Sequence, residues 1–326
     1  MNTAIAELKI AFAKELPAIN AALQREIDQL PALVRPVADH VLNAGGKRLR
    51  PMLTILFARA LGFAGENLHT LASSLEFLHS ATLMHDDILD HADIRRGRPA
   101  AHTVFGLTPT ILAGDVLLAL ANEIVSRTNN AALTGCISKA IMHTATGEIM
   151  EIAAIRNARI THQEYIEIIT GKTAYLIQAA CEFGALAAHA SDRARAQAAA
   201  FGLNLGIAFQ LVDDALDYTA RTATSGKPLG GDLREGKYTL PLLLYLDLLP
   251  EDRRAALHTD LADPHLPAAR QDAIIADIVR HDCARQTREA AQHYLELAKE
   301  ALAVLPQGKE KKLLAAMIDF VLNREM

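Results

Sequence analysis

The sequence predicts an all-α fold. Hydrophobic residues make up 51% of the 326 positions, and in long segments they recur at the spacing of one helix face. Alternating runs rich in β-branched residues, which would indicate strands, are almost absent. No linker rich in Pro, Gly or Ser divides the chain. We therefore expect one domain over residues 1–326, built as a single large helical bundle.

Breaks in the helical periodicity separate the predicted helices. Pro51 suits a first helical turn, and Thr161 with Glu164 has the pattern of a capping box. Other prolines mark the breaks, at Pro31, Pro250 and Pro306. The predicted helices cover residues 2–30, 32–44, 51–62, 66–91, 107–129, 131–156, 161–189, 191–219, 239–249, 251–262, 266–280, 282–305 and 309–324.

Charge and cysteine usage exclude several classes of protein. A formal net charge of -5 gives no general attraction to nucleic acid, so no nucleic-acid partner is expected. The cysteines form no CxxC pair, which is typical of buried thiols in a reducing cytosol rather than of disulfides or zinc sites. They are Cys136, Cys181 and Cys283.

No segment is predicted to enter or cross a membrane. The first residues carry charges throughout, so they lack the apolar core of a signal peptide. The longest uncharged stretch, 196–212, is shorter than the roughly 20 residues that span a bilayer, and it runs into two aspartates. We interpret this stretch as a core helix and expect a cytoplasmic protein.

Two acidic clusters of the same design are the main functional signal. Each follows the apolar run of a predicted helix, in HSATLMHDDILD and in GIAFQLVDDALDY. The clusters consist of Asp86, Asp87 and Asp90, and of Asp213, Asp214 and Asp217. One such cluster alone is often a solvated helix end. Two clusters with apolar flanks favour function, because buried carboxylates are costly unless a cation compensates them.

The spacing within each cluster suits a metal ion. Positions i and i+4 of a helix lie about 40° apart around the axis, so the first and last aspartate of each cluster can hold one ion. The middle aspartate lies about 100° away. Carboxylate oxygens without neighbouring Cys or paired His suit Mg2+, which is usually completed by water and substrate phosphates.

Basic residues accompany both clusters, and they indicate an anionic substrate. A loop with Arg or Lys and Gly follows each cluster, and two further basic segments read AGGKRLRP and TGKTAYL. Glycines let the backbone approach an anion, and Arg grips phosphate oxygens with two donors. The basic residues singled out are Lys47, Arg48, Arg50, Arg95, Arg96, Lys172, Lys227 and Lys237.

Two other motifs are rejected as sites. GDLREGKY has the glycine and lysine spacing of a P-loop, but Tyr238 stands where Ser or Thr is required and no strand precedes it. Two ExxH pairs, Glu66 with His69 and Glu76 with His79, are the ligand pairs of di-iron bundles. On one helix they lie about 15 Å apart along the axis and about 80° apart in direction, so they cannot share one metal pair.

With these motifs together, the chain resembles the trans-polyprenyl diphosphate synthases, and its pattern is most similar to the octaprenyl- and heptaprenyl-type long-chain members. The resemblance rests on GGKRLRP, EFLHSATLMHDDILDHADIRRG, GKTAYL, AFQLVDDALDY and GKPLGGDLREGKYTLPLL, in the family's order. It implies the isoprenoid synthase fold, with a central cavity and the aspartate motifs facing each other across its mouth. It also implies a homodimer.

The resemblance assigns roles to single residues. It implies that Asp86, Asp90 and Asp213 are the leading Mg2+ ligands, supported by Asp87, Asp214 and Asp217, and that these ions hold an allylic diphosphate. The positions matching those that bind this diphosphate or stabilise its departure are Arg95, Lys172, Thr173, Gln210, Lys227 and Lys237. The positions matching the isopentenyl diphosphate site are Lys47, Arg50, His79 and Arg96. His79 by its chemistry alone reads as a structural histidine.

The implied reaction is chain elongation. Mg2+, Arg and Lys stabilise the charge that diphosphate gains as the allylic carbon–oxygen bond breaks, and the double bond of isopentenyl diphosphate then attacks the cation. Loss of a proton restores an alkene, and the released diphosphate is the expected base. The residues expected to carry catalysis are Asp86, Asp90, Lys172, Asp213 and Lys227.

Product length is predicted from two residues before the first cluster. By family analogy, Ala81 and Thr82 border the tunnel into which the product grows, and short-chain synthases of one type place an aromatic there. Small residues leave room, so we expect an all-trans product longer than about twenty carbons, roughly thirty-five to fifty. A geranylgeranyl-type short-chain synthase is the alternative.

Two rival functions remain at this point. A class I terpene cyclase also ionises a diphosphate, but cyclase pockets favour aromatics, and this chain has no Trp and 5% aromatic residues. A subunit of a two-component synthase is the other rival, against which the intact acids and bases argue. Transient membrane contact would serve release of an apolar product.

Overall fold

The computed structural model describes residues 3–219 and 229–324, and within these ranges the chain is helical apart from one short hairpin. The all-α prediction is therefore confirmed. The chain divides into two compact units, each formed from separate stretches of sequence. Unit 1 comprises Met1–Ile141, Ala179–Ala199 and Val304–Leu314. Unit 2 comprises Met142–Gln178, Ala200–Ala303 and Ala315–Met326.

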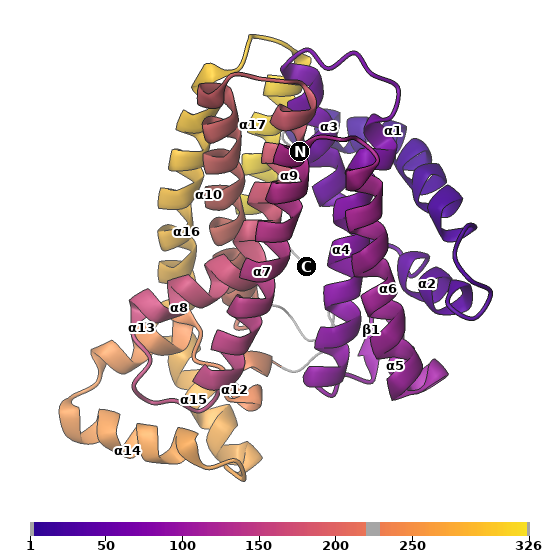
Figure 1. Cartoon of the computed structure of the whole chain (residues 1–326). Coiled ribbons are helices and arrows are strands. Elements are labelled where there is room, and N and C mark those ends of the chain that lie inside the picture. The colour runs from indigo at the N-terminus through magenta and orange to yellow at the C-terminus, as the bar shows by residue number, and fades with distance from the viewer. Residues whose placement is uncertain (1–2, 220–228, 325–326) are drawn as a thin grey trace. The chain divides into compact units, whose positions relative to one another are not determined.

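Unit 1 contains the N-terminal helices and the hairpin. Its elements are α1 (Thr3–Ile27), α2 (Arg35–Leu42), α3 (Leu49–Ala60), α4 (Leu68–Leu89), β1 (Ile94–Arg95), β2 (Arg98–Pro99), α5 (Ala101–Phe105) and α6 (Leu107–Ser126). The strands pair antiparallel, Ile94 opposite Pro99. Helix α4 packs against α1, α3 and α6, and Figure 1 shows α6 alongside it.

Helices α3 and α4 form the core of unit 1. Every residue of α3 from Pro51 to Ala58 is buried, as expected for a helix that is apolar on all sides. The middle of α4 is buried in the same way, including Phe77 and Ala81, which have no exposed surface. The first acidic cluster thus ends a helix that the core holds in place.

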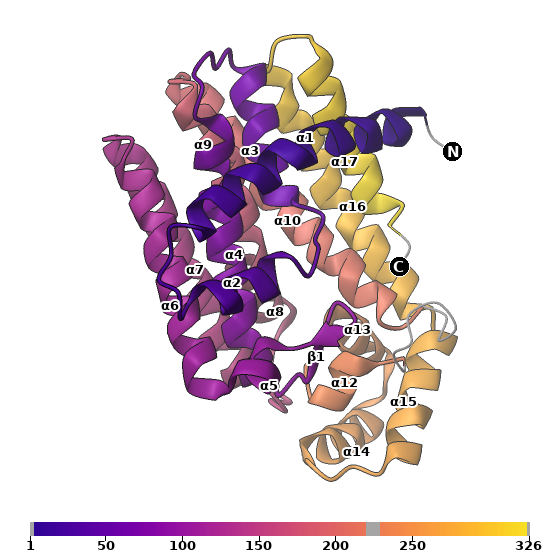
Figure 2. The same cartoon turned by 90° about the vertical axis from the view of Figure 1, so that its right-hand side faces the viewer.

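Unit 2 consists mainly of the C-terminal helices. Its elements are α8 (His162–Ile169), the π-helical turn η1 (Thr170–Ala174), α12 (Gly231–Glu235), α13 (Leu240–Leu248), α14 (Glu251–Ala262), α15 (Ala268–Arg280), α16 (Cys283–Ala301) and η2 (Leu302–Val304). Figure 2 shows α12 to α15 gathered together, and α13 packs on α15 and α16.

Among the described elements, four α-helices contribute residues to both units: α7 (Ala131–Ala154), α9 (Tyr175–Ala187), α10 (Asp192–Leu216) and α17 (Lys309–Leu322). The short turn η2 also crosses the boundary, since its last residue, Val304, belongs to unit 1. The prediction of one domain over 1–326 stays a prediction. A single unfolding transition in calorimetry, with equal calorimetric and van't Hoff enthalpies, would agree with it, and two separate transitions would contradict it.

The helix ends follow local sequence chemistry. Helix α8 begins with a complete capping box, in which the Thr161 hydroxyl accepts from the Glu164 N–H and the Glu164 carboxylate accepts from the Thr161 N–H. The predicted helix 161–189 is not uniform, because the π-helical turn η1 separates α8 from α9. Two five-residue helices, α5 and α12, lie in segments that periodicity cannot identify as helical.

Two helices have the length and composition of membrane spans, namely Leu107–Ser126 and Asp192–Leu216. In Asp192–Leu216 the apolar window is 61% buried within the protein, which is typical of a core helix. This burial agrees with the interpretation of 196–212 from the sequence. In Leu107–Ser126 the buried share is 44%, so part of its apolar surface is exposed.

Candidate functional site

The first acidic cluster lies in the last turn of α4. Asp86 is half-buried, Asp87 is 5% exposed, and Asp90 is the exposed C-cap residue. The last turn of α4 contains no basic residue. Because the carbonyl end of a helix carries partial negative charge, carboxylates are unfavourable there unless a cation is bound. The placement of these acids is thus suited to binding cations.

The middle aspartate of this cluster already has a protein partner. Asp87 accepts a hydrogen bond from the Arg95 Nε at 2.6 Å, and a second guanidinium nitrogen also pairs with it. Arg95 lies in β1, a few residues beyond the end of α4. The hairpin therefore returns its arginine to the helix end and satisfies the buried carboxylate, while Asp86 and Asp90 lie on the more accessible side.

Cationic side chains crowd together elsewhere in unit 1. Loss of solvent lowers the pKa of Arg50 to about 10, with Arg96 adding to the effect. Loss of solvent also lowers the pKa of His79 well below its usual value, and the charges of Arg50 and Arg96 add to this. His79 is therefore neutral near pH 7. The buried acids near this group, Glu76 and Asp87, each pair with another arginine, so the group keeps an excess of positive charge and is suited to an anion.

One buried nitrogen of this group, the Arg50 Nε, indicates that a ligand binds here. The Nε of Arg50 is buried and has no hydrogen-bond partner among the described residues. A buried donor without a partner costs free energy, and an anion would satisfy it. Two glycines before it, Gly45 and Gly46, have φ of +86° and +154°. A Cβ on Gly46 would lie 2.9 Å from the Arg96 Nη1, so glycine permits this close approach.

The remaining basic residue of this loop, Lys47, is exposed. Neighbouring polar groups of unit 1 serve other purposes. Arg48 is 5% exposed and forms a 2.7 Å ion pair with Glu76, and Glu15 pairs with His69 at 3.0 Å. Each ExxH pair thus has a member that is engaged with another helix. The rejection of a di-iron site agrees with these contacts.

The second acidic cluster ends α10 in unit 2. Asp213 has 47% of its side-chain surface exposed and forms a 2.7 Å ion pair with Arg324. The Arg324 guanidinium also lies 4.4 Å from the centre of the Phe209 ring. A cationic side chain stacked on an aromatic ring therefore neutralises the most accessible acid of this cluster.

The middle aspartate, Asp214, is 4% exposed and fully hydrogen-bonded. Its two oxygens accept from the Tyr165 hydroxyl at 2.5 Å and from the Gln210 amide at 2.7 Å. The Gln210 carbonyl accepts in turn from the Thr173 hydroxyl at 2.8 Å. Burial raises the pKa of Asp214 to about 7, although both hydrogen bonds act in the opposite direction.

The last aspartate of the cluster anchors the following loop. One Asp217 oxygen accepts from the Gly231 N–H at 3.1 Å, and the other accepts from the Asp232 N–H at 3.0 Å. These amides belong to the first turn of α12, whose N–H groups have no acceptor within the helix, and Asp217 is their acceptor. Burial raises the pKa of Asp217, and burial followed by the charges of Asp214 and Asp217 raises that of Asp232.

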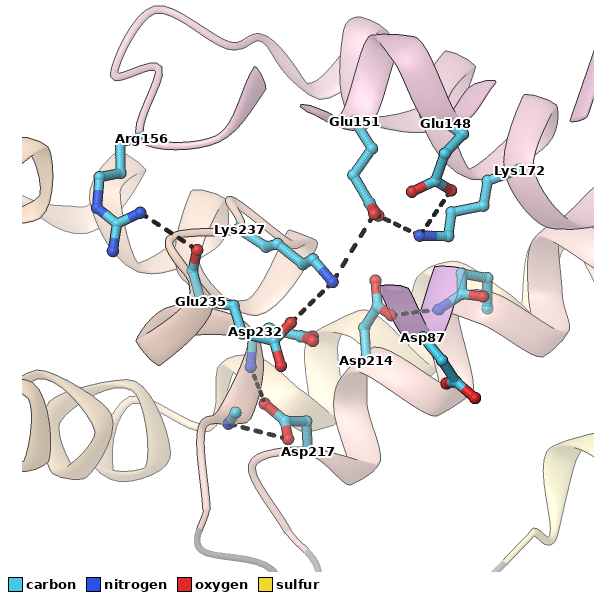
Figure 3. Close-up of polar contacts among 12 residues, drawn as sticks. Asp87, Glu148, Glu151, Arg156, Lys172, Asp214, Asp217, Asp232, Glu235 and Lys237 are labelled. Carbon is cyan, nitrogen blue, oxygen red and sulfur yellow. Dashed lines mark hydrogen bonds and ion pairs between the residues drawn. The ribbon is translucent and has the colours of Figure 1, made fainter. Parts of the chain in front are cut away.

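Two lysines and three glutamates form an ion-pair network in the same unit (Figure 3), in which Lys237 lies 2.8 Å from Glu235. Lys172 lies 2.9 Å from Glu148 and also pairs with Glu151, which is 3.7 Å from Lys237. Burial disfavours the charge of Lys172, but the two glutamates outweigh it and raise its pKa. Lys172 is therefore charged, and both lysines are half-buried, which suits binding of an anion.

Local backbone geometry fixes where Lys172 and Thr173 lie. Both belong to η1, and π-helical turns are often found at functional sites. Gly147 of α7 approaches this turn so closely that a Cβ on it would lie 2.2 Å from the Lys172 backbone nitrogen. The TGKTA segment thus depends on a glycine outside its own motif.

The structure separates the predicted site residues into two sets. Within unit 1 it brings together Arg50, His79 and Arg96, and it pairs Arg95 with Asp87. Within unit 2 it links Thr173, Gln210 and Asp214, and it links Lys172 with Lys237 through Glu151. Ala81 is fully buried in α4, and the Thr82 hydroxyl donates to the His79 carbonyl. Lys227 lies outside the described residues.

Several residues of the site were not found from the sequence. Tyr165 and Arg324 contact Asp214 and Asp213 from 49 and 111 positions away, so no local pattern shows them. Glu148 and Glu151 lie three positions apart in GEIME, a spacing that places both on one face of α7. This spacing could have identified them as site residues, but it is equally typical of a solvent-exposed helix face.

The chain was compared with known proteins. The polyprenyl synthetase family model matches residues 31–276. The octaprenyl diphosphate synthase of Haemophilus influenzae is 31% identical over 310 residues, which cover 95% of this chain and 94% of that protein. The geranylgeranyl diphosphate synthase of Methanosarcina mazei is 34% identical over 315 residues, covering 92% of this chain and 94% of that protein.

A solved structure is similarly close. It is the polyprenyl synthase from Caulobacter crescentus complexed with calcium and isoprenyl diphosphate, at 34% sequence identity and a TM-score of 0.91. The alignment covers 98% of each chain. At this coverage and sequence identity, the similarity indicates a shared family and not only a shared fold.

Proposed function

The chain belongs to the polyprenyl synthetase family and is a prenyltransferase, and from this premise we propose that it condenses isopentenyl diphosphate with an allylic diphosphate to give a long-chain all-trans polyprenyl diphosphate. The observation that carries the proposal is the cation group around Arg50. Its buried Nε lacks a partner among the described residues, and the group adjoins no surplus of acids. Such a group is suited to a diphosphate that binds without a metal.

The acidic clusters are suited to divalent cations. Asp86 and Asp90 at the end of α4, and Asp213 at the end of α10, offer oxygen ligands at the negative ends of helices. In this proposal each helix end holds Mg2+ by itself, α4 through Asp86 and Asp90 and α10 through Asp213, and the bound ions would neutralise charge on the departing diphosphate. The calcium complex of the Caulobacter crescentus synthase supports a divalent cation in the family.

The chain's own residues bind and orient both substrates in this proposal. Lys172, Lys237 and the Gln210 amide donate to the allylic diphosphate, together with Lys227, and they stabilise the charge that it gains as the carbon–oxygen bond breaks. Thr173 contributes by fixing the orientation of the Gln210 amide, whose carbonyl accepts from its hydroxyl. Arg50, Arg96 and Lys47 bind isopentenyl diphosphate, and neutral His79 donates an N–H hydrogen bond to it. Holding the two substrates close and aligned lowers the barrier to carbon–carbon bond formation.

No side chain is assigned as the general base. Among the described site residues, the candidate with a neutral imidazole is His79, which adjoins the cation group. A histidine whose pKa lies well below its usual value is a poor proton acceptor. The departing diphosphate takes the proton in this proposal.

The proposal is tested by incubating the purified protein with Mg2+, labelled isopentenyl diphosphate and geranyl, farnesyl or geranylgeranyl diphosphate. Chain-elongated products that depend on both the metal and the starter are expected. A reaction without starter and one with a chelator are the controls. No incorporation with any starter would overturn the proposal, and products of about twenty carbons would favour the geranylgeranyl-type alternative.

Replacing Ala81 with a large residue is expected to shorten the product. Ala81 has no exposed surface and lies five positions before Asp86, more than one turn below the acids of α4. A Phe there would fill space into which the chain grows. Ala81→Phe should therefore release shorter products than the wild type on reversed-phase chromatography, whereas Ala81→Ser should not. An unchanged product length in Ala81→Phe would contradict the assignment.

We propose a homodimer that forms through α6. This helix exposes large apolar residues in its first two turns, with Leu107 54%, Ile111 37% and Leu112 57% exposed. A cluster of exposed apolar side chains is typical of an interface. The double substitution Ile111→Glu and Leu112→Glu is expected to lower the mass measured by light scattering from that of two chains to one chain of 35.3 kDa. Ala18→Glu, on the exposed surface of α1, is the control, and an unchanged mass in the double variant would contradict the interface.

We propose that the protein works in the cytoplasm and contacts a membrane only transiently, when its apolar product leaves. Cell fractionation tests this. Recovery of the protein in the soluble fraction at physiological salt is expected, and recovery only after detergent extraction would contradict it.

A further inference from the structure

Tyr165 lies outside every motif of the chain, yet it contacts the second acidic cluster. It comes from α8 and is 2% exposed. Its hydroxyl donates to Asp214 at 2.5 Å across 49 positions of sequence. A buried aspartate with a short hydrogen bond from a buried tyrosine is held in one orientation, because both groups would lose their partners by turning away.

The contact continues to residues of the diphosphate site. Asp214 uses its second oxygen to accept from the Gln210 amide nitrogen at 2.7 Å. The carbonyl of that amide must then face away from Asp214, and it accepts from the Thr173 hydroxyl at 2.8 Å. Every donor in the series faces an acceptor, so the orientation of each group determines that of the next. Only one of the two Gln210 amide protons is donated to Asp214, and the other is available to a ligand.

From this series we propose that Tyr165 is a positioning residue for the diphosphate of the allylic substrate. It holds Asp214 toward the protein interior, and through Asp214 it orients the Gln210 amide and the Thr173 hydroxyl. Asp214 is thereby withheld from metal binding, which is left to Asp213. The inference rests on the proposed function for the identity of the diphosphate, but the orientation of Gln210 and Thr173 is independent of it.

Removing the Tyr165 hydroxyl disturbs this order without removing any residue that binds substrate. In Tyr165→Phe, Asp214 lacks one of its two donors and can turn toward Asp213 or accept differently from Gln210. The Gln210 amide can then adopt either orientation, and Thr173 loses a fixed acceptor. The loss should affect diphosphate binding more than folding, because the ring still fills the same volume.

Binding and kinetics together test the proposal. Tyr165→Phe is expected to weaken the binding of inorganic diphosphate with Mg2+, measured by calorimetry, on the order of tenfold. The KM for the allylic diphosphate should rise by a similar factor, while the KM for isopentenyl diphosphate should change less than about twofold. Equal changes in both KM values, or unchanged diphosphate affinity, would overturn the proposal.

Tyr245→Phe is the matched control. Tyr245 is also a buried tyrosine of unit 2 that donates to an aspartate, Asp277, at 3.1 Å. Its hydrogen-bond and ring partners among the described residues, Asp277 and His281, are not site residues. This substitution should leave diphosphate affinity and both KM values unchanged. A similar loss of diphosphate affinity in both variants would show a general effect of removing a buried hydroxyl and would overturn the assignment.

A double-mutant cycle separates positioning from a merely structural role. Gln210→Leu removes the residue through which Tyr165 acts, so it should raise the allylic KM on its own, and it serves as the test if Tyr165→Phe does not fold. Adding Tyr165→Phe to Gln210→Leu should raise that KM no more than about twofold further. Additive effects would overturn the proposal. If the wild type fails to incorporate isopentenyl diphosphate, the proposed function is overturned. The positioning role of Tyr165 is then judged from the binding of inorganic diphosphate alone.

Discussion

Asp86→Ala is expected to lower kcat/KM for condensation on the order of 10³-fold. In the proposed reaction Asp86 holds a metal whose charge is needed when the allylic carbon–oxygen bond breaks, and a lost stabiliser of developing charge typically has an effect of about this size. The loss should lie mainly in kcat, since it concerns the transition state. Rates at saturating substrate, measured over a range of Mg2+ concentrations, test this.

Stability measurements distinguish this loss from misfolding. Asp86 lies at the carbonyl end of α4, where a carboxylate opposes the helix dipole. Its removal should therefore leave the free energy of unfolding unchanged or raise it by about 0.3–1 kcal/mol. Asp192→Ala is the control with the opposite sign: its side chain is 98% exposed, lies outside the site and begins α10, so this variant should keep its activity but lower the free energy of unfolding by about 0.3–1 kcal/mol. Near-normal turnover of Asp86→Ala with Mg2+ present would show that the residue is not a metal ligand.

Gly147→Ala is expected to disable diphosphate binding and to destabilise the fold. A Cβ at this position would lie 2.2 Å from the Lys172 nitrogen and 2.5 Å from the Gly171 carbonyl carbon. Both are backbone atoms and cannot turn aside, so α7 and η1 must separate. We expect a loss of about 1–3 kcal/mol in the free energy of unfolding, together with at least about a hundredfold loss of activity because Lys172 is displaced. Urea unfolding and diphosphate titration measure the two effects.

The same helix supplies the control. Gly135 also lies in α7, but a Cβ there would meet nothing within 4 Å. Gly135→Ala should raise the free energy of unfolding by about 0.5–1 kcal/mol, since alanine favours a helix, and should leave activity unchanged. Gly147→Ala with wild-type stability and diphosphate affinity would show that the contact between α7 and η1 can relax.

The sequence predicted the long helices well, because burial repeats along them with the helical period. The helix expected at 66–91 is observed as α4 (Leu68–Leu89), and the helix expected at 131–156 is observed as α7 (Ala131–Ala154). The π-helical turn η1 could not be predicted. It depends on the close approach of Gly147, which is distant in sequence from the turn.

The types of side chain in the site could be predicted from the sequence, but the different role of each aspartate could not. Both middle aspartates, Asp87 and Asp214, are buried and bound by protein donors, Arg95 and Tyr165. In the DDxxD motif they are equivalent to the neighbouring aspartates, because the motif does not show which side chains from other elements contact each of them. That Asp87 and Asp214 support metal binding stays a prediction. The hydrogen bonds to their carboxylates compete with a metal ion for the same oxygens.

In the proposed function, Arg324 competes with the metal ion for the second cluster. Its guanidinium lies 2.7 Å from the Asp213 carboxylate and is stacked on Phe209. A divalent ion that arrives at Asp213 displaces a resident positive charge, so the net charge added beside that carboxylate is about one unit instead of two. The apparent affinity for the metal is then lower than the intrinsic one by the fraction of molecules in which Arg324 has already moved away. The arginine that is released becomes available to the incoming diphosphate, so metal and substrate should bind cooperatively at this end of α10.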